Sequence, residues 1–307
     1  MVTRLAIIGL GLIGGSIALR SVQRGYQVAG YRLDGLEREQ ALAAGIMVCD
    51  SVSDAVNDAD LVVLAVPLPA MGEVTHQVAN AIQPSATVID VGSVKAPVRG
   101  AIKAAGLASK YVGTHPMAGN EKSGFVAANP TLLVGASWAM TRDDTQSVAL
   151  ESTELASPLA TALRVPGKPL SDWRYQLVYQ YLSGTFDARI IELTDAEHDQ
   201  AQALISGLPH VLAVQLLNQV ANSPIRDTAL ALAAGSFRDG TRVAHTDPCR
   251  TQALVTQNAG LIAPALRDAA QALNKLAVQL EKGQDPAAFF HAADALRVNP
   301  KTRRLFD

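Results

Sequence analysis

The sequence predicts an α/β domain followed by an all-helical domain. Short apolar runs alternate with helical patterns up to about residue 113, which is typical of a parallel sheet with helices on both faces. A glycine-rich turn directly follows the first apolar run, as in folds that bind a dinucleotide. Beyond residue 193 only helical periodicity remains. We therefore expect a Rossmann-type domain over residues 1–193 and a helical domain over residues 194–307.

The expected strands are short runs of apolar and β-branched residues. They cover residues 5–8, 27–31, 60–66, 87–91 and 111–113. The third run ends at Val66 and is followed by Pro67, which would interrupt the hydrogen-bond ladder. Because open α/β sheets bind ligands beyond the carboxyl ends of their strands, we expect Val66 and Pro67 to line a dinucleotide site.

The turn after the first strand reads GLGLIG, with glycines at Gly9, Gly11 and Gly14. Glycines allow a tight turn and let the backbone approach a pyrophosphate. Leu12 and Ile13 begin the following helix, whose N-terminal amides favour an anion. We expect all five residues to contact the cofactor.

The residue after the second strand is expected to read the cofactor's ribose. An acidic side chain there would bind the hydroxyls of NAD, whereas an arginine would neutralise the 2′-phosphate of NADP. Arg32 occupies this position, and Asp34 is an alternative two residues later. NADP is therefore favoured over NAD, and NAD remains the alternative.

Polar side chains follow two later strands of the predicted sheet. His115 lies at the end of one strand, and Ser93 and Lys95 follow the strand before it. This edge of the sheet would hold the nicotinamide, so His115 is a candidate acceptor for the proton of an alcohol that loses hydride. Ser93 could bring its hydroxyl beside His115 and contact the cofactor, and it could at the same time cap the helix that begins near Lys95.

The sequence pattern changes from strands to helices after the last expected strand, residues 188–193. Thr194 and Glu197 have the spacing of a capping box that opens a helix. Asp247 and Pro248 predict the start of the longest helix. Gly260 and Pro264 lie inside it, and we expect a kink near Gly260.

Helices that are more apolar than one small domain requires favour a homodimer through the helical domain. The segment over residues 143–172 is rich in Ser, Thr, Asp and Pro and is expected to form a helix and loop excursion.

Composition excludes several functional classes. The chain has 307 residues, 49% hydrophobic and 18% charged, with a formal net charge of −2, which argues against electrostatic binding of nucleic acid. Cys49 and Cys249 form neither a disulfide framework nor a metal-ligand pattern, so we expect a cytoplasmic protein without a metal. Residues 5–17 are interrupted by glycines, and residues 203–220 carry several polar side chains, so neither a signal peptide nor a membrane span is expected.

A series of segments follows, in order, the motifs of one known family. The segments are the turn at 9–14, GSVK at 92–95, HPMAG at 115–119, EKSG at 121–124, EHD at 197–199, Ser206 with LPH at 208–210, and GSFRD at 235–239 with Thr241 and Arg242. Over nearly its whole length the chain resembles the prephenate/arogenate dehydrogenases of tyrosine biosynthesis.

The resemblance implies roles for five side chains. The histidine that matches His115 serves in deprotonation of the ring hydroxyl, and the serine that matches Ser93 helps to orient it. Ser206 and His210 match residues near the substrate, and their spacing places them on one helical face. Arg242 matches an arginine that holds a substrate carboxylate, a role that suits its planar donor fork.

The implied reaction is the oxidative decarboxylation of a cyclohexadienol with NADP or NAD. Hydride leaves the hydroxyl-bearing ring carbon, His115 takes the hydroxyl proton, and loss of the ring carboxylate gives an aromatic product. Arogenate with NADP is favoured because of Arg32 and because Thr251 stands where prephenate-preferring relatives often carry tryptophan. Prephenate stays a close alternative. Gly207 is a second departure, since many members have histidine there.

Two other functions fit the architecture. A β-hydroxyacid dehydrogenase also joins a dinucleotide domain to a helical domain, but it would be expected to use a lysine there, and none precedes Lys275 in that region. A dinucleotide-sensing protein without catalysis would tolerate loss of His115.

Overall fold

The computed structural model describes residues 2–31, 35–143 and 172–297. The chain forms two compact units, Met1–Ala259 and Gly260–Asp307. The ribose-reading candidates Arg32 and Asp34, and nearly all of the expected excursion over residues 143–172, lie outside the described residues.

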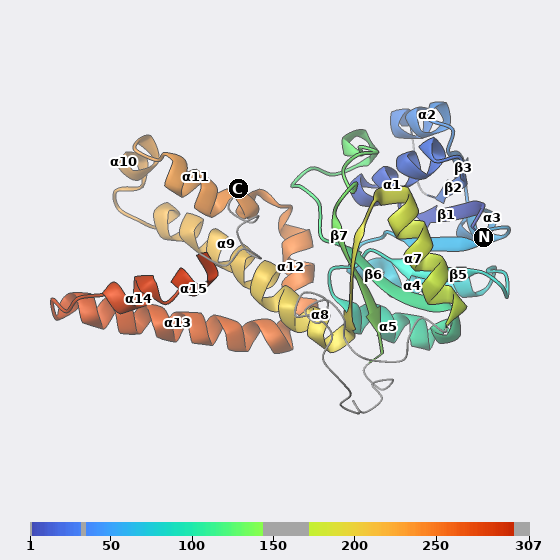
Figure 1. The fold of residues 1–307 in the computed structure, drawn as a ribbon. Helices are drawn as coiled ribbons and strands as arrows, with labels where there is room; N and C mark the ends of the chain where they lie inside the picture. The colour runs from blue at the N-terminus through green and yellow to red at the C-terminus, as the bar shows by residue number, and fades with distance from the viewer. Residues whose placement is uncertain (1, 32–34, 144–171, 298–307) are drawn as a thin grey trace, which may run out of the picture. The chain divides into compact units, whose positions relative to one another are not determined.

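The first unit is built on an eight-stranded mixed sheet with the strand order β3-β2-β1-β4-β5-β6-β7-β8 (Figure 1). The strands are β1 (Arg4–Ile8), β2 (Gln27–Tyr31), β3 (Met47–Cys49), β4 (Leu61–Leu64), β5 (Thr87–Asp90), β6 (Tyr111–Pro116), β7 (Ser137–Arg142) and β8 (Arg189–Thr194). The first six strands in this order, from β3 through β1 to β6, pair in parallel. β7 pairs antiparallel to β6, and β8 pairs in parallel with β7. The crossover point between β1 and β4 is typical of a dinucleotide-binding fold.

All six expected strands are present, and the expectation of a wholly parallel sheet is wrong at β7. This strand reverses direction because no α-helix crosses over between β6 and β7, and an antiparallel neighbour needs no such crossover. Two strands were not predicted from the sequence. β3 has only three residues, and β7 alternates too weakly, with Trp138 to Thr141 all buried.

Alternation along the strands divides the core between the two faces of the sheet. In β1, Leu5 and Ile7 belong to one apolar cluster, and Ala6 and Ile8 belong to the other, as the period of two requires. Helices α1 (Leu12–Gln23), α2 (Gly35–Ala43) and α7 (Trp173–Phe186) contribute to the first cluster. Helices α3 (Val52–Val56), α4 (Met71–Ala79) and α5 (Lys95–Ala104) contribute to the second.

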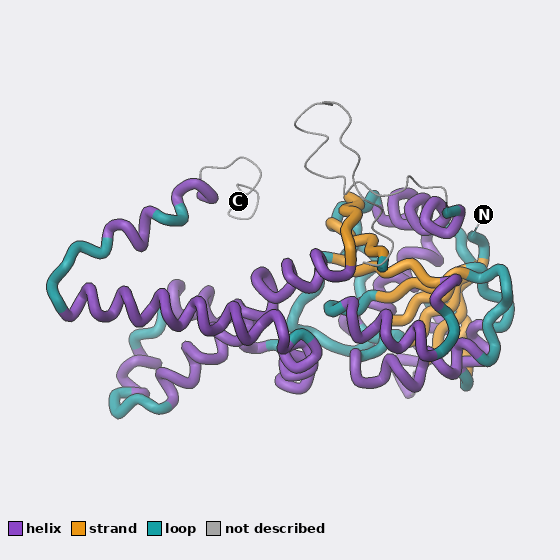
Figure 2. The backbone as a smooth tube through the Cα atoms, turned by 90° about the horizontal axis from the view of Figure 1, so that it is seen from below, coloured by secondary structure: helices purple, strands orange, loops and turns teal. Residues whose placement is uncertain are grey.

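The rest of the first unit is helical, as predicted, and the described chain contains no strand after Thr194 (Figure 2). Its elements are α8 (Asp195–Gln202), a π-helical turn η5 (Ala203–Gly207), α9 (Leu208–Ala221), α10 (Arg226–Ala231), α11 (Gly235–Thr241), η6 (Arg242–His245) and α12 (Pro248–Gln257). The capping box predicted at Thr194 and Glu197 is present in both directions.

The long helix predicted from Asp247 is interrupted close to the predicted kink. Asp247 caps α12 by accepting from the amide of Arg250 at 3.0 Å. The helix stops at Asn258, two residues before Gly260, and Asn258 adopts φ −117° and ψ 24°. Pro264 lies within α13 (Ala259–Glu281) without ending it. The second unit continues with α14 (Ala287–His291) and α15 (Asp294–Arg297).

One helical stretch, Asp195–Ala221, is long and apolar enough by length and composition to span a membrane, with a mean hydropathy of 1.3 in its most apolar window. The polar side chains of residues 203–220 had predicted a helix too polar to span a membrane. A single such helix is weak evidence for a membrane span, because core helices of soluble proteins pass the same test.

Candidate functional site

The glycine turn after β1 forms a backbone cradle. Gly9 has φ +104°, and a Cβ there would lie 2.5 Å from the Ala65 carbonyl oxygen. A Cβ on Gly14 would lie 1.9 Å from the Gly9 carbonyl oxygen, whereas nothing lies within 4 Å of one on Gly11. Gly9 and Gly14 are therefore needed for close packing, and Gly11 faces open space at the N-terminus of α1. This arrangement fits a dinucleotide pyrophosphate.

The other expected cofactor residues follow neighbouring strands. Leu12 and Ile13 form the first turn of α1, which has no side-chain cap. Val66 and Pro67 follow β4, and Val66 Cγ1 borders Gly9. The loop after β6 returns towards this turn, because a Cβ on Gly119 would lie 3.8 Å from Ile13 Cδ1. The loop therefore links the cradle to the end of β6.

His115 lies near the end of β6 and is a partly buried residue. Its Nδ1 lies 3.0 Å from Nε2 of His198 on α8, and the two rings meet edge to face with centroids 5.2 Å apart. Burial lowers the pKa of His115 well below its usual value, and Lys95 and His198 lower it further. The ring is therefore uncharged near neutral pH and can accept a proton.

The ring of His198 is hydrogen-bonded to a carboxylate that is itself held in place. Its Nδ1 lies 2.8 Å from Oδ1 of Asp199, and both side chains are buried. Asp199 also accepts the backbone amides of Lys95 at 2.7 Å and Ala96 at 2.9 Å. The carboxylate of Asp199 thus satisfies the N-terminus of α5, where a negative charge is favoured.

Two further contacts hold α8 against its neighbours. Asn258, at the break after α12, donates from Nδ2 to the Asp199 carbonyl at 2.8 Å. Arg99 on α5 binds the carboxylate of Asp195 with Nε and with a terminal nitrogen. The helix that carries His198 is therefore attached to α5 at Asp195 and to the end of α12 at Asp199.

The side chain of Ser93 does not cap α5. Ser93 was a candidate cap for this helix as well as a candidate catalytic residue. The N-cap position is Val94 without a side-chain cap, and Asp199 provides the capping oxygens instead. Ser93 is partly exposed after β5, so its hydroxyl is available for a bound molecule.

A buried ion pair lies below these groups. Lys95 and Asp90 are both fully buried and bonded to each other, and Lys95 also donates to the Thr114 carbonyl at 2.6 Å. Asp90 accepts the Tyr111 hydroxyl at 2.7 Å and the Thr114 amide at 3.1 Å. Burial, followed by the Asp90 charge, raises the pKa of Tyr111. This network ties β5, β6 and α5 together directly under His115.

His210 contacts the backbone of Ser206 and not its side chain, so joint action of the two side chains stays a prediction. Nδ1 of His210 lies 2.8 Å from the Ser206 carbonyl oxygen, which only accepts, so Nδ1 carries a proton. The turn between them is π-helical next to Pro209, which cannot donate a backbone bond.

The contacts given by the structure do not join His210 to His115. His198 and His210 lie on opposite sides of the π-helical turn Ala203–Gly207. Arg242 begins η6, which packs against α9, and its exposed side chain makes no ion pair within the described residues. These substrate candidates therefore form a second group, on the helical part of the unit.

Three residues of the site were missed as functional by the sequence analysis: His198, Asp199 and Asn258. The motif EHD was noted, but no role was given to its members. The capping box at Thr194 could have indicated two of them, because it places His198 and Asp199 in the first turns of a helix that follows a strand.

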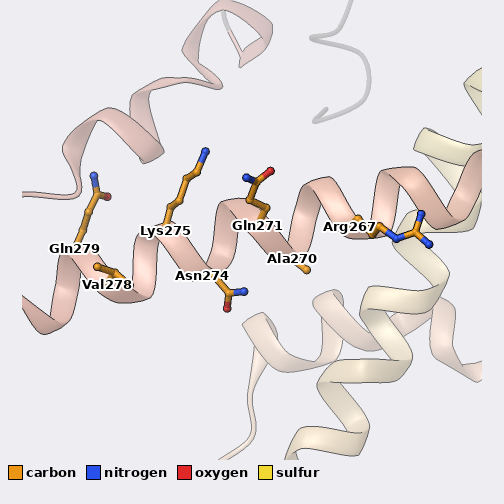
Figure 3. A pocket seen from close by; sticks show the side chains of 7 residues that line it. All are labelled: Arg267, Ala270, Gln271, Asn274, Lys275, Val278 and Gln279. Atoms are coloured by element: carbon orange, nitrogen blue, oxygen red, sulfur yellow. The ribbon is translucent and has the colours of Figure 1, made fainter.

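The second unit carries an open hollow along α13. Figure 3 shows the seven side chains that line it, from Arg267 to Gln279. They combine amides and two cations with short apolar groups, and they contain neither a carboxylate nor a histidine. Nothing in this set resembles the proton-accepting group around His115.

Two family models match the chain. Residues 16–155 match the family described as "Prephenate dehydrogenase, nucleotide-binding domain", and residues 194–292 match "Prephenate dehydrogenase, dimerization domain". Together they cover more than half of the sequence.

Individual proteins agree with these models. A cyclohexadienyl dehydrogenase from Zymomonas mobilis subsp. mobilis is 32% identical over 97% of this chain and 96% of its own length. A prephenate dehydrogenase from Bacillus subtilis is 29% identical over 89% of this chain and 69% of its own length.

Solved structures share the fold. Prephenate dehydrogenase from A. aeolicus, in complex with hydroxyphenyl propionate and NAD+, has a TM-score of 0.77 at 24% identity and covers 99% of this chain and 98% of its own. Arogenate dehydrogenase from Synechocystis has a TM-score of 0.73 at 24% identity, covering 96% and 98%. The fold, the dinucleotide cradle and the matches over both halves lead to one conclusion: the chain belongs to the prephenate dehydrogenase family.

Proposed function

We propose that the protein catalyses the oxidative decarboxylation of arogenate or prephenate, and that arogenate with NADP is the preferred pair. The observation that carries this proposal is His115, an uncharged and partly buried residue at the end of β6, in the sheet that carries the dinucleotide cradle. A protein that only senses a dinucleotide has no need for such a proton acceptor.

In the proposed reaction the substrate's ring hydroxyl lies against His115. The bound nicotinamide supplies the hydride acceptor. His115 takes the hydroxyl proton as the C–H bond of the same carbon breaks, so a ketone forms. The C–C bond to the ring carboxylate then breaks, carbon dioxide leaves, and the ring becomes aromatic. Ser93 would donate to or accept from the hydroxyl and hold it in line with His115.

The far end of the substrate would be held by the helical group. Arg242 would bind a carboxylate through its donor fork. His210 keeps its proton on Nδ1, towards the Ser206 carbonyl, and offers Nε2 as an acceptor. An acceptor suits the ammonium group of arogenate better than the keto oxygen of prephenate. Thr251, in place of tryptophan, also supports arogenate.

The preference for NADP rests on the sequence. Arg32, directly after β2, would neutralise a 2′-phosphate. Asp34 would instead favour NAD, so the two cofactors make a direct test of which side chain reads the ribose.

The assembly we propose is a cytoplasmic homodimer. Residues 1–193 would hold the cofactor, and residues 194–307 would hold the substrate tail and form the dimer. The match of residues 194–292 to a dimerization domain supports this. So do the exposed apolar side chains of Leu273, Val278 and Leu280 along α13, since exposed apolar surface of this kind favours association.

Initial rates with both cofactors and both substrates test the proposed function. Purified protein is mixed with NADP or NAD and with arogenate or prephenate, and reduced nicotinamide is followed by absorbance. We expect the highest kcat/KM for arogenate with NADP. A clear preference for prephenate would show that His210 and Thr251 do not select the tail. The absence of reduction in all four assays, by folded protein that binds cofactor, would refute the proposal.

A further inference from the structure

We propose that His198 and Asp199 are positioning residues that hold His115 in the one tautomer able to act as a base. In this tautomer the proton lies on Nδ1 of His115, and the lone pair of Nε2 faces the substrate. The inference rests on the proposed function for its chemical purpose, although the tautomer itself can be measured without turnover.

The assignment follows from counting donors along the chain of groups. The Asp199 carboxylate only accepts, and it already receives two backbone amides, so Nδ1 of His198 must donate to it. We take the ring of His198 as neutral, so its other nitrogen, Nε2, carries a lone pair. Since Nε2 faces Nδ1 of His115 at 3.0 Å, the proton between them belongs to His115.

The carboxylate at the end of this chain cannot turn away. Oδ1 and Oδ2 of Asp199 accept from consecutive amides at the start of α5, and the backbone next to the side chain is held by Asn258. Asp199 is buried, so water does not compete for its oxygens. The orientation of the His198 ring is therefore fixed by a helix terminus rather than by a flexible side chain.

The charged groups that face the histidine pair come from β5, α5 and α8. Lys95 lies near His115 from α5, and its own charge is balanced by Asp90 on β5. Arg99 on α5 is balanced by Asp195 at the start of α8. Within the described chain, Asp199 is the carboxylate directly bonded to the histidine pair, and it lies beyond His198.

The same hydrogen bonds also stabilise His115 after it has taken up the proton. When the O–H bond of the substrate breaks, its proton passes to Nε2 of His115, and the ring becomes an imidazolium. Its Nδ1–H still donates to His198, which donates in turn to Asp199. A base that is itself oriented by a third group is a recurring solution in enzymes. The pair therefore orients His115 before proton transfer and stabilises it afterwards.

Two substitutions at one position separate orientation from simple packing. His198→Leu fills the space but removes the acceptor for His115 Nδ1–H. His198→Gln keeps a carbonyl oxygen that can reach the same proton. His76→Leu, an exposed histidine on α4, serves as the matched control. We expect kcat to fall about 100-fold in the leucine variant, within the range typical of general-base catalysis, and much less in the glutamine variant. The KM for the cofactor should stay within about twofold.

The tautomer is read by nitrogen NMR of histidine-labelled protein. The chain has six histidines, and the signals of His115 are assigned by comparison with His115→Asn. Wild-type protein and His198→Gln should show a protonated Nδ1 and an unprotonated Nε2 at His115. His198→Leu should show a shift towards Nε2–H.

An Nε2–H tautomer in the wild-type protein would overturn the inference, and so would a leucine variant with unchanged kcat. The wild-type spectrum decides the matter even if the leucine variant fails to fold. A wild-type protein with the expected tautomer but no turnover of either substrate would refute the proposed function while leaving the tautomer assignment intact.

Discussion

The glycine turn at Gly9–Gly14 and the histidine pair His115–His198 lie on the same unit but are built from different parts of the chain. The turn offers main-chain amides and empty space, and its function needs the absence of side chains. The pair depends on side chains from β6 and α8, held by the N-terminus of α5 and by Asn258. A binding site for a phosphate can thus be local, whereas a proton acceptor requires several segments to be folded together.

The largest effect should come from the proton acceptor. His115→Asn removes the base but keeps a polar side chain of smaller size. We expect kcat to fall by about 1,000-fold, within the 10²–10⁴ range of general-base catalysis, while cofactor binding survives. Initial rates and a cofactor titration by fluorescence check this. Turnover at the wild-type level would mean that another group takes the proton.

The next effect concerns the cradle. Gly11→Ala adds a methyl group where nothing lies within 4 Å, at a backbone φ of −78°, so the fold should tolerate it. The methyl group would occupy space needed by the pyrophosphate, and we expect the Kd for the cofactor to rise at least about tenfold, a cost of about 1.4 kcal/mol. Calorimetric titration measures this.

Gly72→Ala on α4 is the control for the cradle, since nothing lies within 4 Å of a Cβ there either. It should leave cofactor affinity unchanged. An unchanged Kd in Gly11→Ala would show that the open space above Gly11 is not where the pyrophosphate binds.

A smaller effect is expected at the break between α12 and α13. Asn258→Ala removes one of two bonds to the Asp199 carbonyl, which still accepts the backbone amide of Ala203, so the free energy of unfolding should fall by about 0.5–1.5 kcal/mol. Looser positioning of Asp199 should also lower kcat several-fold. Denaturant unfolding and initial rates check both. Gln257→Ala, an exposed neighbour, should change neither. Equal effects in the two variants would argue against a specific role for Asn258.

Local patterns in the sequence were sufficient for the elements that depend on neighbouring residues. The GLGLIG turn, the apolar runs of β1 and β4, and the capping box at Thr194 each depend on a few consecutive positions, so they were predicted correctly. The interruption near Gly260 was also expected, although the helix stops at Asn258, whose side chain contacts Asp199.

Long-range contacts explain what the sequence could not provide. The carboxylate that caps α5 lies 104 residues from Lys95, so a nearby serine was the natural candidate for a cap. A role for His198 could not be predicted, because its contact with His115 on β6 forms only in the folded protein. The antiparallel direction of β7 likewise depends on how the chain returns, which no periodicity in residues 137–142 reports.

The pH dependence of kcat/KM tests most directly whether the uncharged ring of His115 is the working base. The pKa of His115 lies well below its usual value of 6.5, because of burial first, then because of the Lys95 charge and because the adjacent rings of His115 and His198 do not both take up a proton. Only the unprotonated ring can accept a proton, so activity is retained above this pKa and lost as the pH falls through it. We predict that kcat/KM at pH 6 stays close to its value at pH 7.5, with an acid limb well below pH 6.5. An acid limb at or above pH 6.5 would contradict the account.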